Sequence, residues 1–320
     1  MVRRSSDFSK CWRATIGHLP ASTRESYETK LRVHVLPAFG GMQLGAISGL
    51  GVREWLSAIQ VNGSSVHTAR QAKQVLGAIL KLAVEEGYIV KNVAAGVKIG
   101  KAAKQEQYLL GDLQVAKLAE VIDQPYGTWV WFMAYSGLRW GETAALRRGR
   151  VDGQRIRVVQ SLSEVGGAHV KETKTYAART VVLPRFVADL LAKHLASRES
   201  DSEALVFNAP EGGVLRSRNF RRRVWAPALQ AAGLPEGVRM HDLRHTCASL
   251  MISEGANPKQ IQRHLGHSSI TVTMDNYGHL FPEDVEALAE RMDTRIRREI
   301  GSAGRDAEGT GRQGTSETGK

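Results

Sequence analysis

The second half of the chain contains the segment HDLRHTCASLM at residues 241–251. Its apolar residues recur at helical spacing, so Leu243 and Cys247 belong to one buried side of a predicted helix. His241 and Arg244 are three residues apart and share another face, which fixes a guanidinium beside an imidazole. An arginine donates two parallel hydrogen bonds to phosphate oxygens, and a histidine exchanges protons near neutral pH. The segment therefore suits a phosphodiester, although taken alone it also fits an ordinary polar helix start.

Two short helices are predicted directly downstream. The first begins at the cap Asn257 and ends at Gly266, which is free to adopt a left-handed turn from which His267 emerges. The second is capped by the serines before residue 270 and leads to Tyr277. A tyrosine phenol acts as a nucleophile where nearby cations favour its phenolate, whereas most tyrosines only pack or hydrogen-bond. Tyr277 is therefore a candidate only in combination with other motifs.

Two further motifs lie upstream. The segment SGLRWGE at 136–142 places Arg139 at a helix start after a glycine turn, and Glu142 follows on the same face, where it can orient the guanidinium. The segment VKETKT at 170–175 lies on a predicted hairpin, from whose edge Lys174 can reach into a cleft. A lone hairpin lysine usually serves only solubility.

The first hundred residues read as helices. Ser22 and Glu25 are typical of a capping box, and the helix they open is expected to end before Pro37. A second helix is predicted over residues 64–86, where Gly87 is placed to stop it. Its polar face carries Arg70, Lys73 and Lys81. This face fits a phosphate backbone, and it equally fits a solvated basic surface.

A basic segment follows these helices. Periodicity is lost between residues 94 and 107, where glycines accompany Lys101. Helical patterns resume at 112–123 and 127–148, and alternating apolar residues between 156 and 182 indicate a small antiparallel sheet. From Pro184 onward the pattern is mainly helical.

These patterns together predict two domains. We expect a mainly α fold with a small antiparallel β-sheet, made of an all-helical domain at 1–100, a linker at 101–107 and an α+β domain at 108–300. A last helix is expected to open at Pro282 and to carry one apolar stripe as far as Ile300. The glycine-rich stretch 301–320 has no aliphatic residue larger than alanine, so we expect it to be disordered.

Composition limits the classes of function. The 320 residues, of which 42% are hydrophobic and 24% charged, are typical of a globular protein and exclude a fibrous chain. The net charge of +12 favours a polyanionic partner. No stretch approaches the roughly 20 apolar residues that span a bilayer, and the start lacks a signal peptide, so we expect a cytosolic protein without a membrane partner. Two cysteines, Cys11 and Cys247, are too few for a disulfide framework or a cysteine zinc site.

Five motifs occur in one order along the chain. They are Gly-Leu-Arg139-Trp-Gly-Glu142, Thr-Lys174-Thr ahead of Arg179-Thr-Val-Val-Leu-Pro, His241-x-x-Arg244-His-Thr, Leu-Gly-His267 and Tyr277-x-His279. In this order they resemble the tyrosine recombinases, the phage integrase family. Upstream, Tyr27 and the segment HVLPAFG at 34–40 resemble the SAM-like helical core-binding domain of integrases. The sequence begins almost at this pattern, so a separate domain for arm-type DNA sites is expected to be absent or shortened.

The resemblance implies a mechanism without metal or cofactor. Tyr277 attacks the scissile phosphate, forms a 3′-phosphotyrosyl link and releases a 5′-hydroxyl. Arg139 and Arg244 hold the non-bridging oxygens and stabilise the transition state in place of magnesium, and His267 donates a further hydrogen bond. The phosphotyrosine retains the bond energy, so a different 5′-hydroxyl can rejoin the strands without ATP.

The resemblance also assigns the proton transfers. Lys174 resembles the hairpin lysine, the general acid for the leaving 5′-oxygen, while Lys171 competes for this role three positions earlier. His241 assists proton transfer at the tyrosine, and Glu142 supports Arg139.

The implied partners are double-stranded DNA and further copies of this chain. A two-domain clamp grips the DNA, four protomers assemble on paired sites, and the helix from Glu283 to Arg298 resembles the segment that docks onto a neighbouring protomer. The expected place of action is the nucleoid in a bacterial host cytosol. The expected DNA contacts are Arg70, Lys73, Lys81, Lys101, Arg218, Arg221 and Arg222.

Three other functions compete with this interpretation. A non-catalytic DNA-binding regulator fits the charge and the arginine cluster at 216–223. A type IB topoisomerase-like enzyme uses the same chemistry on one duplex. A metal-dependent hydrolase could use His241, His245, His264 and His267, but the adjacent glutamate of a zinc-protease helix is missing.

Overall fold

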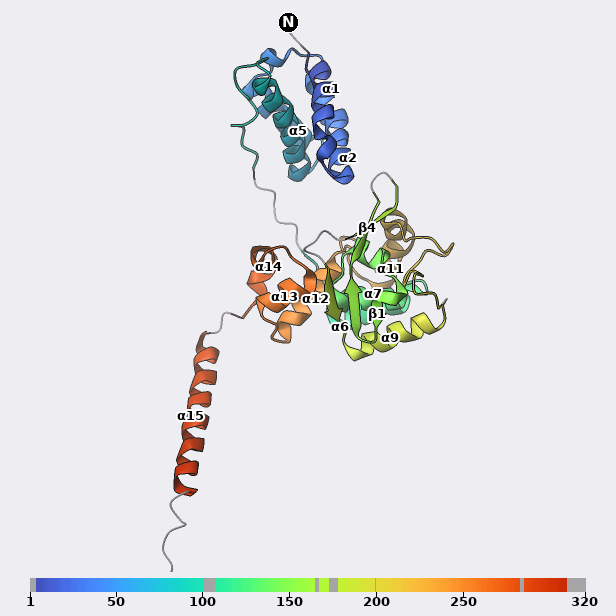
Figure 1. The fold of residues 1–320 in the computed structure, drawn as a ribbon, viewed down its shortest axis with the longest axis vertical. Coiled ribbons are helices and arrows are strands. Elements are labelled where there is room, and N and C mark those ends of the chain that lie inside the picture. The colour runs from blue at the N-terminus through green and yellow to red at the C-terminus, as the bar shows by residue number, and fades with distance from the viewer. Residues whose placement is uncertain are drawn as a thin grey trace, which may run out of the picture.

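The structure is a computed structural model that describes residues 4–100, 107–164, 167–172, 178–198, 200–282 and 285–309. Helices dominate the chain, and the strands are confined to its middle part (Figure 1). The expected mainly α fold with a small antiparallel sheet is confirmed. The buried side chains form three separate hydrophobic clusters: one in the N-terminal helices, a large one between residues 110 and 243, and a small one that includes Tyr277.

The N-terminal cluster belongs to α1 (Ser5–Thr15), α2 (Ala21–Lys30), α3 (Leu36–Phe39), α4 (Gly49–Val61) and α5 (Val66–Glu85). The centre of this cluster is α5, because Val75, Leu76 and Ile79 are fully buried at helical spacing. The Ser65 hydroxyl caps α5 by accepting a hydrogen bond from the N–H of Thr68. The helix predicted over 64–86 is therefore confirmed.

Two prolines lie inside helical segments. Leu31–Val35 form a π-helical turn between α2 and α3, and Pro37 occupies the first turn of α3. The same arrangement recurs where the π-helical turn Arg221–Trp225 precedes Pro227. Proline lacks an N–H and collides with the carbonyl four residues before it, and a widened turn accommodates both defects. The prediction that the helix ends before Pro37 is therefore wrong.

The start of α2 also differs from the prediction. The helix begins at Ala21, and Pro20 occupies the cap position without a side-chain hydrogen bond. Ser22 therefore lies inside the first turn, and the predicted capping box is wrong. Pro20 has a φ of −54° and a ψ of 144°, so it is extended and the helix begins with the next residue.

The second part of the chain begins with α6 (Asp112–Val121), α7 (Tyr126–Ser136) and α8 (Trp140–Ala144). The single helical pattern predicted at 127–148 is thus two helices, which are separated where Gly137 adopts a φ of +61°. This break turns the chain, so that Arg139 stands at the start of α8.

Two small antiparallel sheets follow. The first has the order β1 (Val151–Asp152), β2 (Arg155–Val158), β5 (Arg179–Val182), and the second pairs β3 (Gln160–Ser163) with β4 (His169–Glu172). Ile156 lies opposite Val181, and both side chains are fully buried. This register places Arg179 at the first position of β5, opposite Val158.

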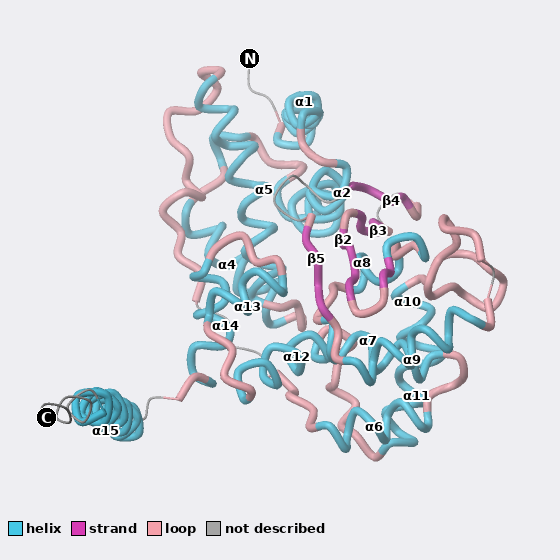
Figure 2. The backbone as a smooth tube through the Cα atoms, turned by 60° about the horizontal axis from the view of Figure 1, so that its bottom comes forward, coloured by secondary structure: helices cyan, strands magenta, loops and turns pink. Residues whose placement is uncertain are grey.

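The remaining helices of this part are α9 (Arg185–Ala196), α10 (Ser217–Phe220), α11 (Ala226–Ala232), α12 (Asp242–Ser253), α13 (Pro258–Leu265) and α14 (Ile270–Tyr277). Asn257 caps α13 through its side-chain oxygen, and Gly266 ends it with a φ of +68°, as predicted. Ser269 caps α14. Figure 2 shows α12, α13 and α14 gathered in one part of the molecule, where they enclose the small cluster around Tyr277.

The last helix, α15 (Val285–Gly309), stands apart from the other elements in both views (Figures 1 and 2). It continues past Ile300 as far as Gly309, and the expected disorder of residues 301–320 stays a prediction. The apolar stripe is exposed, with Leu288, Met292 and Ile296 each about half accessible. In the part of the chain that the structure describes, no helix combines the length and the apolar character needed to span a membrane.

Candidate active site

The first arginine of the site is held by a carboxylate and by a helix end. Glu142 accepts hydrogen bonds at 2.9 Å from both the backbone N–H and the Nη1 of Arg139. The other guanidinium nitrogen of Arg139 donates to the carbonyl of Gly266, 3.1 Å away at the end of α13. Carbonyls at a helix C-terminus have no partner within the helix and carry partial negative charge, so they suit a cation. The predicted pairing of Arg139 with Glu142 is present.

Glu142 binds a second arginine that the sequence motif contained without a role. Arg179 donates two hydrogen bonds to the carboxylate, at 3.0 and 2.8 Å, and a third to the carbonyl of His264. Glu142 is only 3% exposed, and burial alone raises the pKa of a carboxyl group. The hydrogen bonds and charge of Arg179, followed by those of Arg139, outweigh burial and lower the pKa of Glu142 to about 2. The carboxylate therefore stays ionised between two guanidinium groups.

The second predicted arginine of the site is buried. Arg244 is 1% exposed, and it donates to the carbonyls of Gly137 at 2.6 Å and Leu265 at 2.7 Å. Burial, and then the charge of Arg139, lower the pKa of Arg244 to about 10, so it remains a cation at neutral pH. Arg139 and Arg244 therefore bind the adjacent carbonyls of residues 266 and 265, although they come from different helices.

Tyr277 ends α14, is 1% exposed, and belongs to the small hydrophobic cluster, where two histidines contact it. Its hydroxyl forms a 2.8 Å hydrogen bond with Nδ1 of His245, and its ring stacks on His267 at a centroid distance of 6.2 Å. Burial raises the pKa of Tyr277 to about 12, against the opposing charges of Arg244 and Arg139. The phenol is therefore protonated at neutral pH. The positive charges of the two arginines favour its ionised form, but they do not outweigh burial.

The two predicted histidines occupy different positions. His267 directly follows the carbonyls that bind the arginines, and its Nδ1 lies 2.9 Å from the hydroxyl of Thr273. Burial, and then Arg244, lower the pKa of His267 to about 4, so its ring is neutral at pH 7. His241 is exposed at the start of α12, and its ring meets that of His245 edge-on at 4.9 Å.

The histidine that contacts the tyrosine is His245, which the sequence interpretation did not select. The predicted helper of Tyr277 is His241, one helical turn earlier. The contact between His245 and Tyr277 depends on how α14 packs against α12, which no local pattern indicates. The only sequence signal for His245 was its place directly after Arg244.

Two predicted basic residues, Lys101 and Lys174, lie outside the described residues. The competing Lys171 is exposed on β4, opposite Ser161. The other N-terminal candidates lie on α5: Arg70 donates to the carbonyl of Gly100, Lys73 to that of Val97, and Lys81 pairs with Glu85 at 3.5 Å.

A basic groove of about 1080 Å³ leads to His241. Its lining includes Trp140, Arg218, Arg221, Arg222, Glu236, Arg239 and His241. Phe220 and Trp225 are buried beneath it against Trp129, which turns the intervening arginines outward. Three of the predicted DNA contacts therefore line one hollow beside the site.

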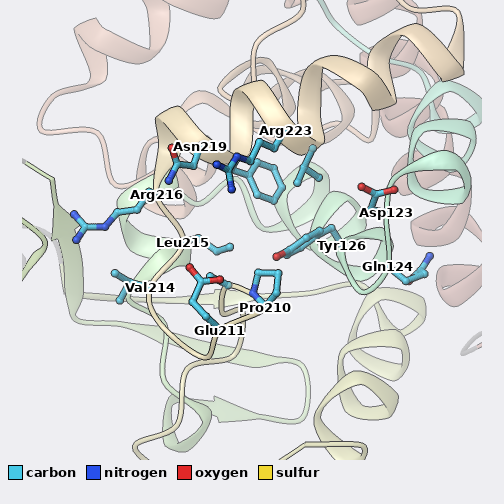
Figure 3. A pocket seen from close by; sticks show the side chains of 13 residues that line it. Asp123, Gln124, Tyr126, Pro210, Glu211, Val214, Leu215, Arg216, Asn219 and Arg223 are labelled. Atoms are coloured by element: carbon cyan, nitrogen blue, oxygen red, sulfur yellow. The ribbon is translucent and has the colours of Figure 1, made fainter.

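The remaining arginines of the cluster at 216–223 face a different cavity. Arg216 and Arg223 line a hollow of about 580 Å³ together with Asp123 and Glu211. Figure 3 shows Arg216, Asn219 and Arg223 along one side of it, with Glu211 and Pro210 across from them. The arginines of the cluster are therefore divided between two hollows, and their binding to phosphate stays a prediction.

The histidines named for a metal-dependent hydrolase take other contacts. His245 binds Tyr277, His267 binds Thr273, and Nε2 of His264 lies 3.7 Å from the sulfur of Cys247. Among the described residues, no three histidine, cysteine or carboxylate side chains gather as a metal site would require.

Comparison with known proteins gives matches over most of the chain. A model of the phage integrase family matches residues 105–284, and a model of the phage integrase central domain matches residues 8–99. The integrase of Mycobacterium phage D29 is 28% identical over 296 residues, which cover 89% of this chain and 77% of the relative. A XerC-like tyrosine recombinase of Caldanaerobacter subterraneus subsp. tengcongensis is 23% identical over 284 residues, which cover 79% and 72%.

Solved structures share the fold. The Tn1549 transposon integrase, in complex with a circular intermediate DNA, matches with a TM-score of 0.79 at 20% identity and covers 90% of this chain and 99% of that one. A lambda integrase tetramer bound to a Holliday junction matches with a TM-score of 0.67 at 18% identity, covering 84% and 79%. At these identities the likeness establishes the fold.

Proposed function

The chain belongs to the phage integrase family and is a site-specific recombinase of a phage or mobile element, and we propose that Tyr277 is the nucleophile with which it cleaves and rejoins DNA. The observation that carries the proposal is the convergence of distant segments on one place. Arg139 and Arg244 bind adjacent carbonyls, and His267, the next residue, stacks on Tyr277. Two cations therefore lie where a phenolic oxygen is already held.

The proposed reaction uses these groups as follows. The two arginines bind the non-bridging oxygens of the scissile phosphate and stabilise the charge that grows as a fifth oxygen approaches phosphorus. Tyr277 replaces the 5′-oxygen and remains linked to the 3′-phosphate. His267 donates a hydrogen bond to the phosphate, and His241 assists proton transfer. Lys174 protonates the leaving oxygen, and a new 5′-hydroxyl reverses the steps.

The proposed substrate is double-stranded DNA. The groove lined by Arg218, Arg221 and Arg222 leads to His241 and supports a path for the phosphate backbone. We assign Arg70, Lys73, Lys81 and Lys101 to further phosphate contacts. Since such contacts release counterions, we expect affinity to fall steeply with salt.

The proposed organisation is a two-domain clamp that acts as a homotetramer on paired sites. The separate hydrophobic clusters support a core-binding domain at 1–100 and a catalytic domain at 108–300, joined by the linker 101–107. The exposed apolar stripe of α15 supports a contact between protomers. We place this assembly at the nucleoid of a bacterial host.

The proposal is tested by covalent capture. DNA that stays attached to the protein in its host is sequenced to find the site, and a nicked duplex carrying that site is then offered to the purified chain. The unaltered chain should form a covalent adduct, whereas Tyr277→Phe should bind the duplex and trap none. An adduct with Tyr277→Phe would refute the nucleophile, and binding without any adduct would favour a non-catalytic regulator.

A further inference from the structure

His245 contacts the reacting oxygen of Tyr277, yet the proposed reaction gives it no part. Its Nδ1 lies 2.8 Å from the tyrosine hydroxyl, and both side chains are buried. We propose that His245 is a further catalytic residue, which takes the phenolic proton as Tyr277 attacks phosphorus and returns it when the strand is rejoined. This inference rests on Tyr277 being the nucleophile.

The surrounding packing gives this contact a defined geometry. His245 lies in the first turn of α12, directly after the buried Arg244, and its ring meets Tyr277 at an angle of 62°. His267 stacks on the tyrosine ring, with an interplanar angle of 13°. Because the hydrogen bond and two ring contacts hold the phenol, its oxygen lies at Nδ1 before any DNA arrives.

The imidazole of His245 and the phenol of Tyr277 are both neutral at pH 7. Burial, and then His241, lower the pKa of His245 to about 4, so the imidazole is neutral at pH 7 and Nδ1 can accept a hydrogen bond from the phenol. With a tyrosine pKa of about 12, only about one phenol in 10⁵ is ionised at pH 7, so the attack needs a base. The charged and titratable groups that act on His245 are Arg239, His241, Asp242, Arg244, His267 and Tyr277.

The proposed transfer balances in both directions. The Oη–H bond of Tyr277 breaks and an Nδ1–H bond forms on His245, while the Oη–P bond forms and the bond from phosphorus to the 5′-oxygen breaks. That oxygen takes a separate proton from the general acid. In rejoining, a 5′-hydroxyl attacks phosphorus and gives its proton to that acid group, and the imidazolium returns a proton to the departing phenolate.

The test replaces two buried histidines one at a time. The rate of adduct formation is measured with a nicked duplex that carries the captured DNA site. His245→Asn keeps a polar side chain but cannot take a proton, and we expect adduct formation to slow by about 10²- to 10⁴-fold. His194→Asn is the matched control, because His194 is also 8% exposed and burial also lowers its pKa, while its ring bonds to the carbonyl of Val206 away from the site. The control should remain within about threefold of the unaltered chain. Equal rates for His245→Asn and the unaltered chain would overturn the inference.

Two chemically altered reactants distinguish a role of His245 as a base from a role in packing alone. A fluorinated tyrosine at position 277 has a more acidic phenol. In His245→Asn it should therefore raise the rate of adduct formation at least about tenfold. A 5′-bridging sulfur in the DNA leaves without a proton, so it should not restore His245→Asn. Absence of rescue by the fluorinated residue, or full rescue by sulfur, would contradict the proposed role. If the unaltered chain forms no adduct at all, the proposed function fails instead.

A measurement without DNA serves if His245→Asn does not fold. In chains with ¹⁵N-labelled histidine, Tyr277→Phe should shift the Nδ1 resonance of His245 toward that of an unbound acceptor nitrogen. An unchanged resonance would show that the phenol does not donate to this nitrogen, which excludes the transfer.

Discussion

At the residue scale, the Glu142 carboxylate fixes the geometry of the first arginine. A buried carboxylate is stable only when its charge and its oxygens are matched, and here Arg179 supplies two hydrogen bonds while Arg139 supplies the other two. Arg179 is 9% exposed, whereas the side chain of Arg139 is 41% exposed and open to a ligand. Arg179 is therefore the anchor, and Arg139 is left open to the phosphate of the proposed reaction.

We predict that Arg179→Ala lowers the free energy of unfolding by about 3 kcal/mol, because it leaves the buried Glu142 carboxylate with one partner. Adduct formation should slow as well, since Arg139 is then held by a less fixed carboxylate. Urea unfolding and the nicked-duplex assay measure the two effects. Arg147→Ala is the control, because its pair with Glu203 is exposed and worth less than about 1 kcal/mol.

The acid side of the pH profile tests the same pair. The pKa of Glu142 is lowered in the folded state, so its stabilisation is complete above the ordinary carboxyl range and is lost as the pH falls toward about 2. In Arg179→Ala this pKa rises, and the difference in stability between the two chains should shrink as the pH falls below about 4. A constant difference would contradict the ion pair as its cause.

The sequence indicated one of these contacts and not the others. Arg139 and Glu142 are three residues apart at a helix start, a spacing that predicts their pairing. Arg179 is 37 residues from Glu142, and His245 is 32 residues from Tyr277. Contacts at such separations depend on the packing of whole elements, and no local spacing encodes them.

At the element scale, two glycine-ended helices hold the arginines. The carbonyl of Gly137 after α7 accepts from Arg244, and that of Gly266 after α13 accepts from Arg139. Both glycines have positive φ, which the turns need in order to present these carbonyls. The helix end at Gly266 was predictable from sequence, since glycine is the usual residue there, whereas the helical pattern predicted over 127–148 ran across Gly137. The π-helical turns were not predictable, because proline normally ends a helix and the widened turn that admits it leaves no simple periodicity.

We predict that Gly266→Ala is more harmful than Gly255→Ala. Both positions have φ between +60° and +80°, so each alanine costs about 1 kcal/mol in backbone strain. At Gly266 the added Cβ would also lie 2.9 Å from Nη1 of Arg179, whose guanidinium cannot withdraw without leaving Glu142. At Gly255 the Cβ meets open space. Thermal unfolding and adduct formation should both separate the two variants, and equal effects would contradict the contact.

The segment from α10 through the π-helical turn presents different arginines to two hollows. We predict that Arg222→Ala weakens DNA binding and lowers the slope of log affinity against log salt by about 1, as the loss of one phosphate contact requires. Arg223→Ala removes the same charge from the neighbouring cavity and should leave that slope nearly unchanged. In that cavity two arginines share the lining with two carboxylates, whereas in the groove four arginines share it with Glu236 alone. Fluorescence anisotropy across a salt series measures both variants. Identical slopes for Arg222→Ala and Arg223→Ala would show that the groove does not bind the phosphate backbone.

At the scale of the whole molecule, the apolar stripe of α15 has no cover within the described part of its own chain. Val285 and Ile300, at the two ends of the stripe, are 69% and 68% exposed. A long helix with one apolar face gains stability chiefly by packing that face against another surface. In the proposed function, reaction at a single DNA site uses groups between residues 139 and 277, whereas strand exchange between two sites needs protomers that contact one another.

We therefore predict that a chain ending at Asp284 binds one DNA site within about threefold of the full chain but recombines two sites about 100-fold more slowly, because only the second process gains from contacts between protomers. The double variant Leu288→Ser with Met292→Ser should behave like the truncation, since it removes the stripe and keeps the helix. Arg297→Ala, on an exposed ion pair with Asp293, is the matched control and should recombine normally. Gel-shift binding and two-site recombination are measured on the same preparations. Equal loss of both in the truncated chain would mean that α15 supports the single protomer on DNA, and a normal rate in the double variant would exclude the stripe as the contact between copies.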